Sequence, residues 1–264
     1  MRKDLLKYTA LVLLAATVTS CQKVIDVDLN SGDPKVVIEG GISDQPGPYH
    51  IRLTRTVNFD RPNEFPAISG ASVRISDDAG NAEMLTETSP GIYTCSTLLG
   101  TPGRVYTLEV SADGEVYTSS STLPDPVPID SLTLEDALFG AGKTVNVHFR
   151  DPAGIVNYYR VIQVVNGVER KDIYGTDDKL LDGTEIQLTL FNQLEDSLVN
   201  GDTVDIRLQS IDKISFEYFR TLAQLTGSGG PPSDAPANPI SGISNGALGY
   251  FTAYSVKSKR IIVR

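Results

Sequence analysis

The stretch Asn-Tyr-Tyr-Arg-Val-Ile-Gln-Val-Val at residues 157–165 is followed by Asn166-Gly167 and by a second extended run at 169–174. The first run is rich in β-branched and aromatic side chains, which favour a pleated strand. Asn-Gly is a strong hairpin signal, because both residues tolerate the positive φ that a tight two-residue turn requires. The segment therefore predicts an antiparallel hairpin, and the fold class follows from how often this pattern recurs.

The second half of the chain repeats the strand pattern and interrupts it with one helix. Between 215 and 226 apolar side chains recur at helical spacing; Ser215 is predicted to cap this helix and Gly227 to end it. We predict a C-terminal, fibronectin III-like β-sandwich over residues 131–264. Its remaining strands are expected at 144–150, 185–190, 203–211 and 250–263.

The first half alternates apolar and polar residues in shorter runs. Seven strands, including a weak one at 84–86, are predicted within residues 35–122, with Gly, Pro, Asn and Asp turns between them. This spacing is typical of a small immunoglobulin-like or transthyretin-like sandwich. Alternate prolines at 123–130 favour extended chain and mark a linker. The predicted fold class is mainly β, with two antiparallel β-sandwich domains and one short helix near the C-terminus.

The N-terminus has the form of a secretory signal peptide. Basic residues precede a short apolar run at 8–16, and Val18-Thr19-Ser20-Cys21 follows. The apolar run is too short to span a bilayer. The ending resembles the bacterial lipobox, so we expect residues 1–20 to be removed, Cys21 to be acylated and residues 21–34 to form a tether.

The net charge limits the classes of molecule that the protein can bind, and the cysteine count limits its disulfide bonds. The net charge of −10 argues against nucleic acid, because phosphate binding needs a basic face. The chain has two cysteines, so acylation of Cys21 would leave Cys95 without a disulfide partner. Cys95 lies in a strand-like run, and we interpret it as a buried thiol rather than a nucleophile.

The sequence gives little sign of catalysis. Its one G-x-S-x-G match, at residues 242–246, leads into a predicted strand rather than a helix, and it contains no H-E-x-x-H. Its two histidines, His50 and His148, fall on predicted strands in different domains. Asp177-Asp178 and Glu195-Asp196 could hold a hard cation, but adjacent acids in polar loops are usually solvated surface. We expect no catalytic residue, metal site or cofactor, with a hydrolase of unrecognised type as an alternative.

Several short segments, in their order along the chain, resemble the domain of unknown function 4249 family. Asp151-Pro152 followed by residues 157–160 matches its "DP…NYYR" passage, and residues 36–40, 51–55 and 238–251 fit the same order, although Ala247-Leu248 interrupts the usual glycine-rich ending. The resemblance implies a lipoprotein of Bacteroidetes-type bacteria linked to TonB-dependent outer-membrane transporters. It implies no chemistry, so no functional residues are carried over.

The loop at 227–239 is the sequence's candidate for a contact surface. It is long, polar and rich in Gly and Pro, and such loops inside compact domains are usually functional or disordered. We expect an outer-membrane lipoprotein, on the cell surface or the periplasmic face, that binds a small molecule or peptide or caps a transporter; the alternative is a structural envelope protein without a ligand. The residues predicted to contact a partner are Gly229, Gly230, Pro231, Pro232, Asn238 and Pro239.

Overall fold

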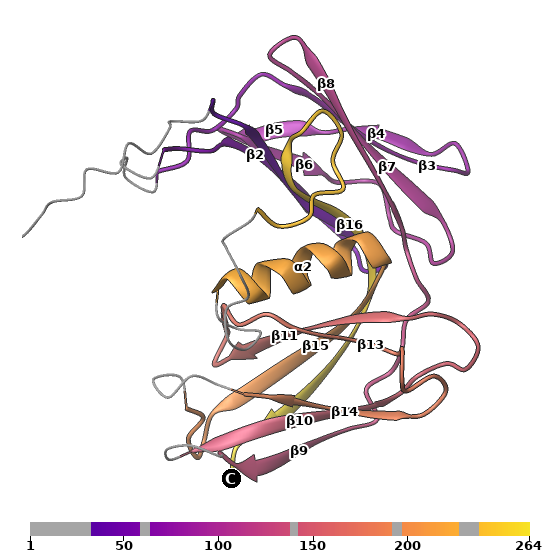
Figure 1. Ribbon diagram of the computed structural model, residues 1–264, viewed down its shortest axis with the longest axis vertical. Coiled ribbons are helices and arrows are strands. Elements are labelled where there is room, and N and C mark those ends of the chain that lie inside the picture. Colours follow the sequence, from indigo (N-terminus) through magenta and orange to yellow (C-terminus); the bar gives the residue numbers. More distant parts are fainter. Residues whose placement is uncertain (1–32, 59–63, 138–141, 192–196, 227–237) are drawn as a thin grey trace, which may run out of the picture. The chain divides into compact units, whose positions relative to one another are not determined.

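The computed structural model describes residues 33–58, 64–137, 142–191, 197–226 and 238–264. In this part the chain forms sixteen strands and one helix, which confirms the mainly β fold class. The strands make three sheets, and the largest has nine strands in the order β12-β11-β15-β16-β1-β2-β6-β5, with β13 added beside β11 (Figure 1). The assignment to immunoglobulin-like, transthyretin-like or fibronectin III-like types stays a prediction.

The strands of the nine-stranded sheet come from both halves of the sequence. They are β1 (Val36–Ser43), β2 (Tyr49–Arg55), β5 (Thr86–Ser89), β6 (Ile92–Cys95), β11 (Tyr158–Val165), β12 (Val168–Glu169), β13 (Tyr174–Asp177), β15 (Thr203–Ile211) and β16 (Leu248–Ile262). A four-stranded sheet has the order β4-β3-β7-β8 and a three-stranded sheet the order β14-β10-β9. Their strands are β3 (Ser72–Asp77), β4 (Ala82–Met84), β7 (Val105–Ala112), β8 (Glu115–Thr122), β9 (Ser131–Asp136), β10 (Lys143–Arg150) and β14 (Glu185–Leu190).

Strand β16 joins the two halves of the large sheet. Its residues 248–254 pair with β1 and its residues 255–262 pair with β15. The pairing with β1 is parallel, unlike every other strand pair in the described part of the chain. A parallel pair needs a long connection, which is available because β1 and β16 lie near opposite ends of the chain. The domain boundary at 123–130 stays a prediction, and the large sheet continues across it.

The two smaller sheets cover one face of the nine-stranded sheet. Successive side chains of a strand point to opposite faces. On β16, Phe251 and Ala253 join the apolar core formed with the four-stranded sheet, while Ile261 packs on the core formed with the three-stranded sheet. These odd-numbered positions share a face. The even-numbered positions face the other way, where Tyr250 and Tyr254 pack on a third cluster that includes residues of the helix.

The helix, α2 (Lys213–Thr226), begins two residues before the sequence predicts. Ser215 is not its cap: the Asp212 carboxylate accepts a hydrogen bond from the Ser215 backbone N–H at 2.9 Å, and the Ser215 side chain is buried. Asp212 is the better cap, because its carboxylate lies where the helix dipole is positive. The predicted terminator, Gly227, lies outside the described residues.

Two local predictions in the strands have opposite outcomes. The Asn166-Gly167 hairpin is confirmed, with Val165 opposite Val168 and φ values of 50° and 82° at the two turn residues. The single strand at 84–86 is wrong, because β4 and β5 lie there in different sheets. Leu85 between them is buried in the core and turns the chain from one sheet to the other.

Two carboxylates in the first half hold loops in place. Glu83 on β4 accepts hydrogen bonds from the backbone amides of residues 96–98 at 2.7–2.9 Å. Burial acts to raise the pKa of Glu83, but these amides outweigh it and lower the pKa to about 2. Burial likewise opposes ionisation of Asp77, yet hydrogen bonds from Asn81 and from Arg104, 2.5 Å away, lower its pKa to about 2.

Stability should therefore fall in acid. Both groups have folded-state pKa values below their usual ones, so their contribution is complete above about pH 4.5 and is lost as the pH falls towards 2. Glu83→Gln should lower the free energy of unfolding at neutral pH by about 2 kcal/mol and flatten its decline between about pH 5 and pH 2. Denaturant melts across this range measure both effects, with Glu115→Gln, an exposed glutamate, as the control. An unchanged pH slope in Glu83→Gln would contradict the assignment.

Candidate functional site

Most site residues chosen from the sequence lie outside the described residues, namely Cys21, Gly229, Gly230, Pro231 and Pro232. Of the remaining two, Asn238 is exposed and Pro239 is partly buried. Their roles in lipidation and partner binding stay predictions. The geometry instead directs attention to the face of the large sheet that the two smaller sheets leave open.

A cleft of about 520 Å³ lies on this open face, and we call it the sheet-face cleft. Its floor is formed by Arg160 on β11, Gln209 on β15 and the even-numbered positions Thr252 and Tyr254 on β16. A second cleft of about 320 Å³, bordered by α2, shares its lining residues Arg160, Ile162, Glu169 and Tyr250 with the first. The shared residues make the two hollows neighbours on one face of the sheet.

Arg160 is the central charged group of this site. Its guanidinium carbon lies 3.9 Å from the centre of the Phe219 ring, a cation–π contact, and its Nη1 lies 3.4 Å from the Gln209 amide oxygen. Its Nε is shielded from solvent and has no hydrogen-bond partner, and Arg160 makes no ion pair within the described ranges. Burial lowers the pKa of Arg160, but an arginine starts so high that it stays protonated.

Aromatic rings enclose the arginine on the helix side. The Tyr250 ring lies 4.9 Å from that of Phe219 and 5.0 Å from that of Tyr218, in geometries favourable for aromatic pairs. Burial raises the pKa values of the Tyr218, Tyr250 and Tyr254 phenols, so these groups remain neutral donors. The Thr252 hydroxyl is also buried and lacks a hydrogen-bond partner. The site can therefore offer a positive charge, neutral donors and apolar surface together.

The sequence predicts a strand at Arg160 and places this residue in a family-like passage, but it does not indicate a site there. The available signal is its position: an arginine within the apolar run Tyr-Tyr-Arg-Val-Ile-Gln-Val-Val is unusual in a half-buried strand. That signal cannot show which strands face Arg160, because Thr252 and Tyr254 are about ninety positions away in the chain. The cleft depends on these long-range neighbours.

Asp151 and Tyr159, from the same family-like passage, have a structural role. Both side chains are buried, and the Tyr159 hydroxyl donates to the Asp151 carboxylate at 2.5 Å. The other carboxylate oxygen accepts the Gly183 backbone N–H at 3.0 Å. Burial, then the neighbouring Asp151, raises the pKa of Tyr159. This arrangement fixes the turn after β10 to strand β11 and so supports the adjacent Arg160.

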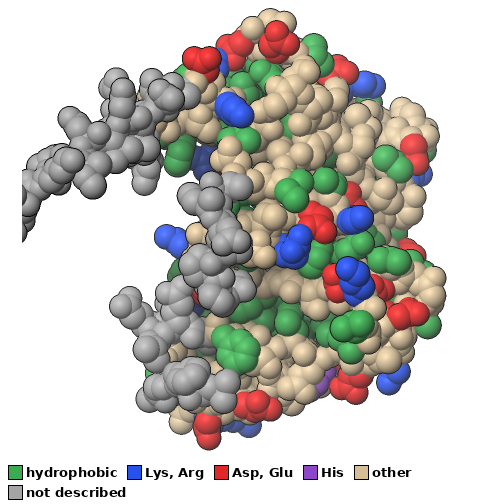
Figure 2. Space-filling view, in the orientation of Figure 1, with side chains coloured by type: hydrophobic (Ala, Val, Ile, Leu, Met, Phe, Trp, Pro, Cys, Tyr) green, Lys and Arg blue, Asp and Glu red, His purple; other side chains and the backbone are tan. Residues whose placement is uncertain are grey.

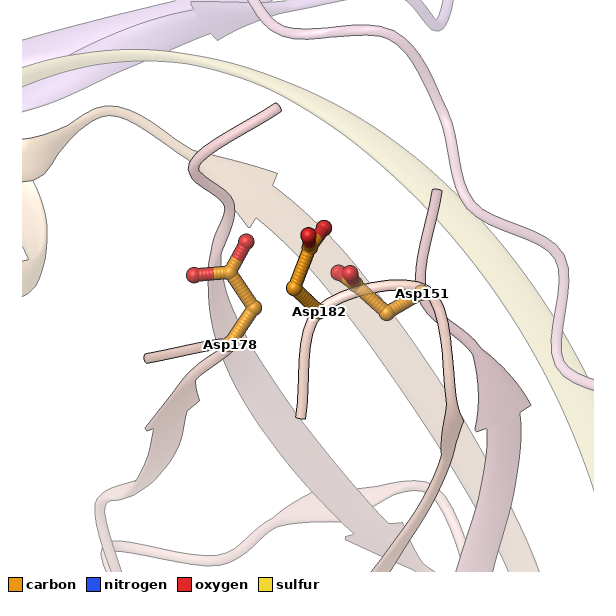
Figure 3. A group of neighbouring side chains, drawn as sticks. All are labelled: Asp151, Asp178 and Asp182. Atoms are coloured by element: carbon orange, nitrogen blue, oxygen red, sulfur yellow. The ribbon is translucent and has the colours of Figure 1, made fainter. Parts of the chain in front are cut away.

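Asp178 corrects one expectation about the acidic pairs. Its side chain is buried rather than solvated, because its carboxylate accepts the Asn157 backbone N–H at 2.8 Å and closes a loop. Figure 3 shows it beside Asp151 and Asp182. Asp182 is exposed, and one carboxylate oxygen from each of the three residues lies within 4.8 Å of the other two. Hydrogen bonds to the fold account for the position of each carboxylate, including Asp182, which accepts the Gly154 N–H. Glu195-Asp196 lies outside the described residues.

Cys95 and the histidines lie where the sequence places them. Cys95 is fully buried, as the sequence predicts, and burial together with Glu83 raises the pKa of its thiol to about 12, which disfavours the nucleophilic thiolate. His50 on β2 borders the sheet-face cleft and lies 3.1 Å from the Thr94 hydroxyl. His148 is on β10 in another sheet, so the two histidines do not share a site.

The surface carries no single dominant charge on the side shown in Figure 2, where acidic and basic side chains are interspersed. Within the ranges that the structure describes, no helix is both long and apolar enough to cross a bilayer.

Comparison with known proteins gives one family. The family model described as "Domain of unknown function (DUF4249)" matches residues 22–260. No curated protein matches the chain. A solved structure described as "Cytokine receptor complex - Crystal form 1A" aligns at 12% identity over 87% of this chain and 96% of that chain, with a TM-score of 0.25, a value too low to carry an argument.

Proposed function

The chain belongs to the DUF4249 family, and from this premise we propose that it is an outer-membrane lipoprotein that binds a ligand as an accessory of a TonB-dependent nutrient transporter. The observation that carries the binding role is the sheet-face cleft, whose volume of about 520 Å³ suits a small ligand. Its position on an open sheet face leaves it accessible, while the two smaller sheets stabilise the fold from the opposite side.

The anchor in this proposal is Cys21. The signal-like segment before it supports export, and a lipid on Cys21 would hold the protein at a membrane despite its net charge of −10. That charge gives no attraction to anionic lipid, so the acyl chains would supply the binding energy.

The partner surface in this proposal is the segment 227–239. Helix α2 ends at Thr226 immediately before it, and after it the Ile240 backbone N–H bonds to the Thr221 hydroxyl of the same helix at 3.2 Å. The segment thus starts and finishes on the helix whose Phe219 contacts Arg160. Because the described residues on both sides of the segment lie on or bond to this helix, a transporter bound there could receive ligand from the cleft, which supports a role in ligand transfer.

Membrane fractionation followed by copurification tests the proposal. We expect the wild-type protein to stay with membranes after a carbonate wash and to copurify with a barrel transporter, whereas Cys21→Ala should be released or remain unprocessed. Replacing residues 228–236 with a Gly-Ser linker should keep the thermal midpoint within a few degrees and remove the transporter from the purified complex.

Each outcome has a distinct meaning. Retention on washed membranes of a Cys21→Ala variant from which residues 1–20 have been removed would exclude lipid anchoring. A wild-type protein that is membrane-bound but carries no transporter would favour a structural envelope lipoprotein. Unchanged copurification of the linker variant would move the contact surface away from 227–239.

A further inference from the structure

The sheet-face cleft holds a cation without a matching anion. A guanidinium taken out of water is unfavourable unless a counter-charge or several hydrogen bonds compensate it. Arg160 has one long hydrogen bond to Gln209 and a ring contact with Phe219, and its Nε has no hydrogen-bond partner. Thr252 adds a second buried polar atom without a partner on the same cleft floor. Both features are typical of a site that is completed by a ligand.

The charge of the residues that line the clefts is opposite in sign to the net charge of the whole chain. The whole protein has a net charge of −10, but the two neighbouring clefts are lined by more basic than acidic side chains. The charged residues are Arg160, Arg170, Lys171 and Arg207 against Glu169 and Asp172. Arg207 is already paired with Glu169 at 3.5 Å, and Arg160 is the basic residue that lines both clefts, so it is the charge best placed for a ligand. Charge complementarity therefore favours an anion.

We propose that this cleft binds a small organic carboxylate with an apolar or aromatic body, its carboxylate on Arg160 and its body against the aromatic wall. Arginine is suited to this task because its planar fork matches a carboxylate. Tyr250, Phe219 and Leu222 provide the apolar wall next to the charge. The inference rests on the proposed ligand-binding function and names the chemical class of its ligand.

The same contacts favour one negative charge over two. Nη1 of Arg160 already contacts Gln209, and the two oxygens of a carboxylate need fewer donors than the three of a phosphonate. Glu169 lines both clefts, and its carboxylate would repel a second charge. A monocarboxylate satisfies the guanidinium without adding this repulsion.

Calorimetric titration of the purified full chain tests this with three probes that each carry one phenyl ring. They are 3-phenylpropionate, its neutral amide 3-phenylpropionamide, and phenylphosphonate. We expect saturable binding of 3-phenylpropionate, with at least about tenfold weaker binding of the amide, because a hydrogen bond to a charged group contributes this much or more. Phenylphosphonate should bind no more tightly than the carboxylate.

Variants locate the site. Arg160→Met keeps an apolar stem against Phe219 and should weaken 3-phenylpropionate binding at least about tenfold, while Arg160→Lys should lose less because it retains the charge. The control is Arg260→Met, because Arg260 is an exposed arginine on β16 that pairs with Asp205 at 2.6 Å outside both clefts. The affinity of Arg260→Met for 3-phenylpropionate should be within about twofold of that of the wild type. Circular dichroism and the thermal midpoint verify that each variant is folded.

Three results would overturn the inference. One is the absence of saturable binding of 3-phenylpropionate up to about 10 mM, and another is equal affinity for the acid and the amide. The third is a folded Arg160→Met variant that binds like Arg260→Met. If Arg160→Met fails to fold, the comparison of acid and amide on the wild type still decides. Membrane fractionation and transporter copurification are measured separately, so failure here leaves the accessory role intact, and the reverse also holds.

Discussion

Gly249→Ala should lower the free energy of unfolding by about 4 kcal/mol, because it combines backbone strain with a clash inside a strand pair. Gly249 has φ +100°, and a Cβ there would lie 2.0 Å from the backbone oxygen of Ile38. Ile38 is its register partner in the parallel pairing of β1 with β16. Neither strand can shift without breaking that pairing, so the clash cannot relax cheaply.

Gly246→Ala is the matched control for this prediction. Gly246 also has a positive φ, +67°, but no atom lies within 4 Å of the Cβ position. Gly246→Ala should lower the free energy of unfolding by about 1 kcal/mol, from backbone strain alone. Denaturant unfolding of the two variants measures the difference, which reports the close approach of β1 and β16. Similar losses in both variants would mean that this approach contributes little.

Asp151→Ala should lower the free energy of unfolding by about 3 kcal/mol. The substitution removes a buried acceptor, and it leaves the buried Tyr159 hydroxyl and the part-buried Gly183 N–H without a partner. Each unsatisfied donor costs about 1–3 kcal/mol. Tyr159 is fully buried and its ring packs edge-on against Phe149 at 4.8 Å, so the hydroxyl cannot turn to solvent.

Asp182→Ala provides the comparison. Asp182 belongs to the same group of carboxylates, but it is exposed and accepts one backbone hydrogen bond, so its removal should cost under about 1 kcal/mol. Asp151→Asn should lie between the two, since it keeps an acceptor for one of the two donors. Equal thermal or denaturant midpoints for Asp151→Ala and Asp182→Ala would contradict the structural role assigned to Asp151.

Interactions between residues close in sequence determined much of the local structure of this protein. The Asn166-Gly167 hairpin follows from residues that tolerate positive φ, and the apolar spacing around Phe216 and Phe219 identifies the helix. The buried thiol of Cys95 follows from its place in a strand-like run. In each case the interaction that selects the structure joins residues close in sequence, so a short window contains the whole signal.

Strand pairing between distant segments, and the cleft that depends on it, were decided only by the tertiary structure. Nothing in a short window shows that β16 pairs in parallel with β1, or that Asp178 becomes buried against the loop at Asn157. The cleft around Arg160 likewise requires β11, β15, β16 and α2 to meet on one sheet face. These contacts join segments far apart in the chain, and which distant pairs form depends on how the whole core packs rather than on any local preference.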